Sequence, residues 1–168
     1  MLELNLSWND LEFGIVQKPF ELQGNNLDDS SLSFYDNKIE CLLSSEKQWH
    51  GFQLNGDISF SFIEHCDRCL LEYKDKQKTT LKILLTNNRD LIQKENDDTL
   101  WFDKSDKIID IGPIIRDQIL TTESIKKICN QDCKGICQYC GKNQNKGSCN
   151  CDSKETTDNR WENLKELV

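Results

Sequence analysis

Apolar and polar side chains alternate most regularly in the stretch from Leu54 to Ile63. The alternation places Ile58, Phe60 and Phe62 on one side and Asp57, Ser59 and Ser61 on the other. A period of two is typical of a β-strand with one buried face. A second strand is predicted over residues 79–85, and less regular mixing predicts strands over 32–43 and within 1–23. Together these segments indicate an antiparallel, β-rich domain.

A Cys-x2-Cys turn, Cys66-Asp-Arg-Cys69, lies between the two clearest strands. Such a turn points both sulfurs in one direction and turns backbone N–H groups towards them. The sequence therefore predicts a hairpin with a metal-binding turn at its tip.

A helical repeat of isoleucines follows later in the chain. Ile111, Ile114, Ile115 and Ile119, with Leu120 at the margin, fall on one stripe at helical spacing. Asp110 is the candidate N-cap and Pro113 suits the first turn. We expect a helix over about 111–121 whose stripe packs on the core. A short final helix is also predicted, capped by Asp158, with one face formed by Trp161, Leu164 and Val168.

These elements define the expected architecture. Residues 86–107 hold six acids and four bases around Leu100, Trp101 and Phe102, which indicates a solvated acidic connector. The fold class is α+β: a small antiparallel β-rich domain with a helix and a zinc-bound cysteine-rich C-terminal segment. We expect a core domain over 1–125, and a cysteine-rich tail over 126–168 that ends in the short helix.

Composition limits the classes of protein. The chain has 168 residues, 36% of them hydrophobic and 30% charged, with a mean hydropathy of -0.67. These values allow a modest core. No secretory signal and no membrane-spanning run is recognisable, so we expect a cytoplasmic protein without a membrane partner. The net charge of -8 argues against indiscriminate binding to nucleic acid.

The cysteines carry the main chemical signal. Six of the nine fall within 129–151, and a further two form the pair at Cys66 and Cys69. Such crowding indicates a metal, disulfides or redox chemistry. A reducing cytoplasm disfavours disulfides, and an odd total fits eight ligands and a spare Cys41. Gly141, directly after Cys140, suits the positive φ of a zinc knuckle.

Eight thiolates divide naturally into two tetrahedral four-cysteine zinc sites. We pair Cys66 and Cys69 with Cys129 and Cys133, and assign Cys137, Cys140, Cys149 and Cys151 to the second site. A rival arrangement uses tail cysteines alone for a single zinc and leaves Cys66 and Cys69 spare. The tail has few sizeable apolar groups, so structural zinc would supply its folding energy.

No catalytic set accompanies the cysteines. The tail has no histidine to suggest an open, catalytic zinc, and His65, beside Cys66, is expected to be exposed or to lie outside the ligand set. No P-loop, dinucleotide fingerprint or Ser-His-Asp set appears, which indicates a protein without a small-molecule substrate. Lysines outnumber acids by four between Lys126 and Lys154. This excess either compensates the charge of the zinc sites or forms a phosphate-facing patch. The candidate RNA contacts are Lys126, Lys127, Lys134, Lys142 and Lys146.

Several blocks, in order, resemble the YceD family of bacteria and plastids, named for accumulation of large-subunit ribosomal RNA. The blocks are Cys66-Asp-Arg-Cys69-Leu, Ile109-Asp-Ile-Gly-Pro-Ile-Ile-Arg-Asp-Gln-Ile-Leu, Cys133-Lys-Gly-Ile-Cys137-Gln-Tyr-Cys140-Gly-Lys-Asn-Gln-Asn, Cys149-Asn-Cys151 and Asp158-Asn-Arg160-Trp-Glu-Asn-Leu-Lys. The resemblance implies a small, non-enzymatic factor needed for normal 23S ribosomal RNA levels and large-subunit biogenesis. Its implied partners are large-subunit ribosomal RNA or ribosomal proteins. Some family members lack counterparts of Cys137 to Cys151, which favours the pairing of Cys66 and Cys69 with Cys129 and Cys133.

Two other functions stay open at this stage. The acidic chain suits a protein–protein adaptor that engages basic ribosomal proteins without touching RNA. A Cys-x2-Cys pair could also serve a thiol oxidoreductase, which needs an accessible thiol with a depressed pKa.

Overall fold

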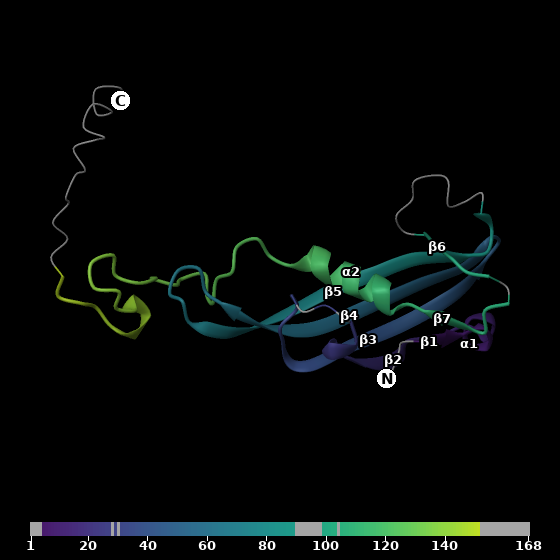
Figure 1. The fold of residues 1–168 in the computed structure, drawn as a ribbon, viewed down its shortest axis with the longest axis horizontal. Coiled ribbons are helices and arrows are strands. Elements are labelled where there is room, and N and C mark those ends of the chain that lie inside the picture. Colours follow the sequence, from purple (N-terminus) through teal and green to yellow (C-terminus); the bar gives the residue numbers. More distant parts are fainter. Residues whose placement is uncertain (1–4, 28, 30, 90–98, 104, 152–168) are drawn as a thin grey trace, which may run out of the picture.

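A curved antiparallel sheet forms the body of the protein, seen here in a computed structural model (Figure 1). The structure describes residues 5–27, 29, 31–89, 99–103 and 105–151. Five strands lie in the order β2-β3-β4-β5-β6. They are β2 (Lys18–Gln23), β3 (Phe34–Gln48), β4 (Gly51–His65), β5 (Glu72–Thr86) and β6 (Thr99–Trp101). All neighbours are antiparallel except β5 and β6, so the expected α+β class with an antiparallel sheet is confirmed.

The three central strands are longer than the sequence pattern indicated. β4 pairs with β5 from Phe52 opposite Leu85 to His65 opposite Glu72, so the two form one long hairpin. The predicted strand over 54–63 lies within β4, and that over 79–85 lies within β5. The longest segment that alternation missed, residues 72–78 of β5, lies towards the tip of the hairpin, where polar side chains occupy both faces of the strand.

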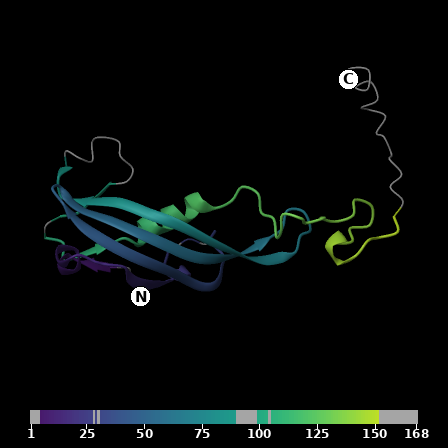
Figure 2. The same cartoon turned by 180° about the vertical axis from the view of Figure 1, so that it is seen from behind.

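One face of the sheet carries the hydrophobic core. Ile39 and Leu43 of β3, Leu54 and Ile58 of β4 and Leu85 of β5 are fully buried there. Helix α2 (Gly112–Thr122) covers this face, with Ile115 and Ile119 buried and the Gln118 amide donating to Thr79 Oγ1 on β5 at 3.0 Å. The isoleucine stripe therefore packs on the core as predicted. Figure 2 shows the same layers from behind.

The N-terminal region contains a helix that the sequence pattern did not indicate. Helix α1 (Trp8–Phe13) begins after Ser7, whose hydroxyl oxygen accepts from the Asp10 N–H at 3.1 Å. A second small sheet pairs β1 (Asn5–Ser7) with β7 (Ile108–Asp110). Because that pairing keeps Asp110 extended, α2 begins one residue later than predicted and its N-cap is Ile111. The Asp110 carboxylate still accepts from the Gly112 N–H at 2.8 Å.

The connector is partly ordered by its aromatic residues. Within 86–107 the structure describes 86–89, 99–103 and 105–107, and β6 continues the sheet beside the end of β5. Phe102 is buried, with its ring 5.4 Å from that of Trp8. The predicted final helix at Asp158 lies outside the described residues. The division of the chain into a core domain over 1–125 and a tail over 126–168 stays a prediction.

The cysteine-rich segment extends beyond the tip of the β4–β5 hairpin, at the end of the molecule away from α1 (Figures 1 and 2). Its two short ordered features are an isolated bridge between Ile136 and Asn143 and a 3-10 turn, η3 (Gln144–Lys146). Of its larger apolar side chains, Ile125, Ile136 and Tyr139 are exposed, and Ile128 is half-buried against Cys66, Cys69 and Cys133. The segment thus has no hydrophobic core of its own among the described residues.

Candidate metal centres

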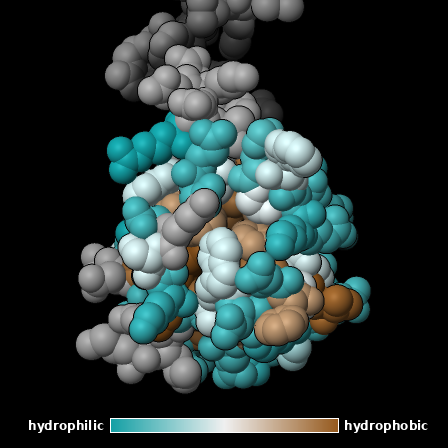
Figure 3. All heavy atoms as spheres, turned by 90° about the vertical axis from the view of Figure 1, so that its right-hand side faces the viewer, coloured by the Kyte–Doolittle hydropathy of each residue, from teal (hydrophilic) through white to brown (hydrophobic). Residues whose placement is uncertain are grey.

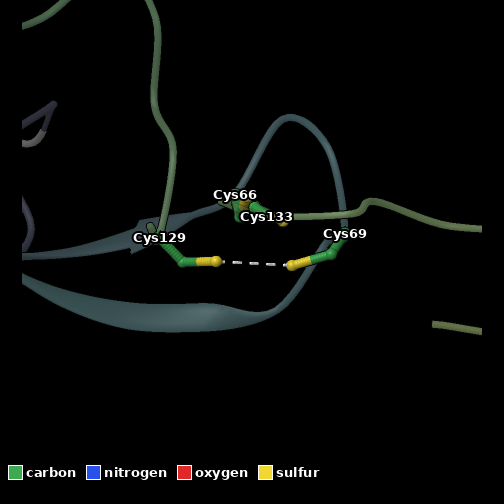
Figure 4. A group of neighbouring side chains, drawn as sticks. All are labelled: Cys66, Cys69, Cys129 and Cys133. Atoms are coloured by element: carbon green, nitrogen blue, oxygen red, sulfur yellow. Dashed lines mark hydrogen bonds between the residues drawn. The ribbon is translucent and has the colours of Figure 1, made fainter. Parts of the chain in front are cut away.

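Four sulfurs meet where the hairpin tip contacts the segment that follows α2. Cys66 and Cys69 come from the turn between β4 and β5, and Cys129 and Cys133 from the later segment (Figure 4). All four sulfurs lie within 4.8 Å of one another. The Cys66–Cys133 sulfurs are 3.8 Å apart and the Cys69–Cys129 sulfurs are 3.7 Å apart. These are the four residues that the sequence analysis paired in one site. The rival arrangement left Cys66 and Cys69 spare, and it does not account for this group.

The first group fits a tetrahedral metal ion. A tetrahedron with Zn–S bonds of about 2.3 Å has edges of about 3.8 Å, which the two sulfur–sulfur distances match. A disulfide would need about 2.05 Å, and all nine cysteines, each in a described residue, are free. The donor set and its spacing are therefore compatible with zinc. The metal ligation itself stays a prediction.

The hairpin turn presents backbone donors to its first sulfur. Burial opposes ionisation of Cys66, but backbone N–H groups of Cys129, Cys69 and Arg68 donate to its sulfur and lower its pKa to about 6. The Leu70 N–H closes the turn on the Cys66 carbonyl oxygen at 2.8 Å, and Leu70 adopts a φ of 57°. The turn thus has the form of a metal knuckle, with a leucine in the left-handed conformation.

The Cys129 thiol resists ionisation, in contrast to that of Cys66. Burial, together with the thiol of Cys129 donating to Cys66 and to its other neighbours, raises the Cys129 pKa to about 12. Four thiolates this close repel one another, so the group cannot carry four negative charges alone. A bound divalent cation removes that conflict, because the metal deprotonates its thiol ligands.

Several contacts fix the later segment to the hairpin tip. The Asp67 N–H donates to the Lys127 carbonyl oxygen and the Lys127 N–H to the Asp67 carboxylate, each at 2.8 Å. The Arg68 guanidinium donates to the Cys133 carbonyl oxygen at 3.0 Å. The Lys127 ammonium pairs with Glu123 and Glu64, which raises its pKa. Cys129 and Cys133 are therefore held beside the knuckle by contacts that do not involve sulfur.

The second group repeats the knuckle in a more exposed setting. The sulfurs of Cys137, Cys140, Cys149 and Cys151 also lie within 4.8 Å of one another, so they too could hold a metal. The Gly141 N–H donates to the Cys137 carbonyl oxygen at 2.9 Å, and Gly141 has the predicted positive φ, 70°. Backbone N–H groups of Cys140 and Tyr139 lower the Cys137 pKa to about 6. Cys140 and Cys151 are exposed, so solvent reaches this group more readily.

Two asparagines connect the second group to the first. Asn145, in the loop between Cys140 and Cys149, donates its side-chain N–H to the Cys133 sulfur at 3.2 Å. The side-chain oxygen Oδ1 of Asn145 accepts from the Lys134 N–H at 2.8 Å, and the side-chain amide of Asn143 donates to the Cys69 carbonyl oxygen at 3.5 Å. Neither asparagine stands out in the sequence as a candidate site residue. The position of their loop between two ligand pairs is the signal that could have identified them.

The candidate RNA-contacting lysines differ in their surroundings. Lys126, Lys134, Lys142 and Lys146 are exposed, and no acidic side chain of the described residues forms an ion pair with them. Lys142 donates to the Ser148 carbonyl oxygen at 3.0 Å, while Lys127 is only half-exposed and held by two glutamates. Contact with RNA stays a prediction for all five.

Two other residues considered are not members of either sulfur group. His65 is exposed at the end of β4, and its nitrogens are not part of either sulfur cluster. Cys41 is buried within β3, and burial raises its pKa to about 12. Among the described residues, no helix is both long and apolar enough to cross a lipid bilayer.

Comparison with known proteins gives a family. Residues 54–168 match the family model described as Large ribosomal RNA subunit accumulation protein YceD. The Zea mays protein named Large ribosomal RNA subunit accumulation protein YCED homolog 1, chloroplastic, is 38% identical over 81 residues, which are 48% of this chain and 27% of that protein. The Arabidopsis thaliana protein of the same name is 42% identical over 59 residues, 35% of this chain and 18% of that protein.

The chain therefore matches well under two thirds of the length of either relative. No solved structure gives a significant match. The family model begins in β4 and includes both cysteine groups and α2, so it covers the elements that build the candidate metal centres. Since that match extends over more than half of the 168 residues, the chain belongs to the YceD family.

Proposed function

We propose that this chain is a non-enzymatic factor for accumulation of 23S ribosomal RNA and biogenesis of the large ribosomal subunit. The observation that carries the proposal is membership of a family described by large ribosomal RNA accumulation. The chain acts by contact with ribosomal RNA or a ribosomal protein, and two structural zinc ions shape the segment that makes the contact.

A structural role for zinc agrees with the donor sets. Each group supplies four sulfurs, which fill a tetrahedral shell and leave no open position for a substrate or an activated water. The segment beyond Ser124 exposes Ile125, Ile136 and Tyr139 and half-buries only Ile128, so metal binding rather than apolar burial supplies most of its folding free energy. Purified protein should carry two zinc ions and show no disulfide reductase activity; a metal-free, reductase-active protein would contradict this assignment.

The exposed lysines of the segment supply a surface for an anionic partner. Lys126, Lys134 and Lys146 carry charge into solvent without an acidic partner among the described residues. Cations in this arrangement contact phosphate groups and add a salt-dependent component to binding. Lys127 contributes instead to the internal network with Glu64 and Glu123.

Depletion of the protein tests the proposal directly. Cells without the chain should accumulate less 23S ribosomal RNA and fewer large subunits, with 16S ribosomal RNA as the internal reference. Restoring the unmodified chain should restore both quantities. Unchanged 23S levels and an unchanged subunit profile after depletion would rule the function out.

An adaptor role is the second candidate, and exposed apolar side chains favour it. Phe13, Val16 and Trp49 are 89%, 85% and 93% exposed. Figure 3 shows apolar side chains among polar ones at the end of the molecule that carries α1. Large exposed apolar groups are typical of protein-binding surfaces. Partners that co-purify after RNase treatment would support the adaptor; loss of every partner would exclude it.

A further inference from the structure

Strand β5 carries a row of lysines on the solvent face of the sheet. Lys74, Lys76 and Lys78 occupy alternate positions, and Lys82 follows two positions after Thr80. All four are exposed, whereas Leu81 and Ile83, which point the other way, are buried in the core. Successive side chains on one face of a strand are about 6.6 Å apart, so the row from Lys76 to Lys82 extends about 20 Å.

Three of these lysines differ from the other lysines of the sheet. Lys18, Lys38, Lys47 and Lys74 each form an ion pair with an aspartate or glutamate. Lys76, Lys78 and Lys82 form none with the described residues. Three uncompensated positive charges in line are notable on a chain with a net charge of -8.

The neighbouring strand surrounds the row with neutral polar groups. Ser61, Ser59 and Asn55 of β4 lie directly opposite Lys76, Lys78 and Lys82. The single acid of β4 on this face, Asp57, lies opposite Thr80, and Glu40 lies one strand further away on β3. The positive charge is thus concentrated along β5 from Lys74 to Lys82, with Glu72 of the same face at the start of the strand, and the other acids lie towards β3 and β2.

The face is also hollowed beside the row. A cavity of about 1150 Å³ extends across the strands from β5 to β2. Its lining includes Lys78 and Thr80 of β5, Asp57 and Ser59 of β4, Glu40 and Leu42 of β3, and Pro19 and Glu21 of β2. Carboxylates and hydroxyls accept hydrogen bonds from the amino groups of bases, and an apolar side chain contacts their faces. A polynucleotide whose phosphates follow β5 would direct its bases towards this hollow.

We propose that Lys76, Lys78 and Lys82 bind the phosphate backbone of a single-stranded segment of RNA. The spacing along the strand is comparable with the repeat of phosphates in an extended polynucleotide, and lysine ammonium groups bind phosphates as point charges. Asp57 of β4 forms no ion pair with the described residues, so it disfavours a phosphate backbone further from the edge of the sheet, whereas Glu40 is neutralised by Lys38. This surface lies on the same hairpin as the first cysteine group, since β5 begins shortly after Cys69.

That the bound RNA is ribosomal rests on the proposed function. The binding of single-stranded RNA by the lysine row does not. Lysines on an edge strand have another known role, which is to prevent pairing between sheets of different molecules. Along Glu72–Ile83, β5 pairs with β4 alone among the described strands, so this role applies here too. If the lysines only prevent pairing between sheets, removing their charges should cause self-association without any loss of RNA affinity.

A charge-matched pair of variants separates the two roles. The test protein is Lys76→Gln/Lys78→Gln/Lys82→Gln, and the control is Lys18→Gln/Lys38→Gln/Lys47→Gln, which changes net charge equally at ion-paired positions. Both are compared with the unmodified, metal-loaded chain for binding to fluorescent oligouridine of 20 nucleotides and to transcribed 23S ribosomal RNA. Affinity is measured over a range of salt, together with metal content, thermal unfolding and oligomeric state.

We expect the test variant to bind at least tenfold more weakly, and the slope of log affinity against log salt to fall by about 2 for single-stranded RNA. The control should stay within about twofold of the unmodified chain. Equal affinities and slopes for the two variants would overturn the inference, as would self-association of the test variant with normal RNA binding. Failure of the unmodified chain to bind either RNA would overturn it as well.

Replacement of the chain in cells keeps this inference distinct from the function. If depletion lowers 23S ribosomal RNA but the test variant restores it fully, the function stands and the lysine row is not its RNA surface. If depletion has no effect while the row binds RNA in the test tube, the function fails and the surface stands. A test variant that folds, retains its metal and fails to restore 23S levels supports both.

Discussion

The side-chain amide of Asn145 donates to the sulfur of Cys133 at 3.2 Å, although the two residues belong to different cysteine groups. Asn145 lies in the loop that the second group closes, and Cys133 belongs to the first group. The hydrogen bond also contributes to lowering the pKa of the Cys133 thiol, since the amide stabilises its thiolate. The two centres are therefore linked by a polar contact rather than built as separate modules.

Asn145→Ala should weaken metal binding at the first group. A lost hydrogen bond to a ligand commonly costs about tenfold or more in metal affinity. The measurement is zinc transfer to a competing chelator, resolved into two phases. Gln138→Ala, an exposed change between Cys137 and Cys140, is the control and should leave both phases unchanged. Equal transfer rates for Asn145→Ala and the unmodified chain would contradict the link.

Cys137→Ser and Cys66→Ser should have different consequences. Cys137→Ser removes one of two metal ions and loosens the distal loop, because its group draws all four ligands from residues 137–151. Cys66→Ser removes the other ion and also releases the segment after α2 from the hairpin. Metal content and hydrogen exchange distinguish the two. Loss of both ions from Cys137→Ser would show that the first group cannot form alone.

Leu70→Gly should stabilise the protein by about 1 kcal/mol, since a left-handed conformation costs a leucine about that much. Leu70 has a φ of 57° and is 65% exposed, so removing its side chain sacrifices little packing. The corresponding position of the second knuckle is Gly141. Chemical denaturation measures the change, with Leu71→Gly, at an ordinary φ, as the control that should destabilise. A destabilised Leu70→Gly would refute the argument.

Acid should release metal only below about pH 6. The pKa values of Cys66 and Cys137 are lowered to about 6, so their thiolates are stabilised in the folded state. That stabilisation is fully present above the ordinary thiol pKa, and it is lost as pH falls through the lowered pKa of the folded protein. Bound metal lowers the pKa of its thiol ligands further. A chromophoric chelator follows the release. Release already complete between pH 7 and 8 would contradict the prediction.

Removal of metal by a chelator at neutral pH should affect the two parts of the chain differently. The sheet has its own core around Ile58 and Ile115, so its amide protection should persist. Amides from Ile128 to Cys151 should exchange rapidly, because that segment buries sulfur atoms and little else. Hydrogen exchange with and without metal measures both, and loss of protection throughout the sheet would contradict the expectation.

The sequence predicted the elements that depend on local pattern. Alternation around Phe60 and the Cys-x2-Cys turn identify the hairpin and its tip, and the spacing of Ile115 and Ile119 identifies α2. The division of eight cysteines into two groups was reached from spacing and from the need to anchor the tail. The strand and helix signals are local in the sequence. The metal signal rests on clustered cysteines, which have few other roles.

Other features depended on tertiary contacts that the pattern does not contain. Helix α1 is short and is stabilised by the Ser7 cap and by Trp8 packing on Phe52 and Phe102. Strand β6 forms within the acidic connector because Leu100 and Phe102 pack against the core. Asn145 could not be assigned to Cys133 without knowing that the second loop folds back on the first group. Lys127, a candidate RNA contact, proves to be engaged by Glu64 and Glu123.

The separation of the cysteines along the chain sets an order of maturation. The second group spans 15 consecutive residues, so a nascent polypeptide can complete it as soon as that stretch is synthesised. The first group joins Cys66 to Cys133, 67 residues apart, and must wait until the hairpin has formed and α2 has docked. With metal bound at both groups as proposed, occupancy of the first would record that the long-range architecture is complete, and immature chains would carry a single ion.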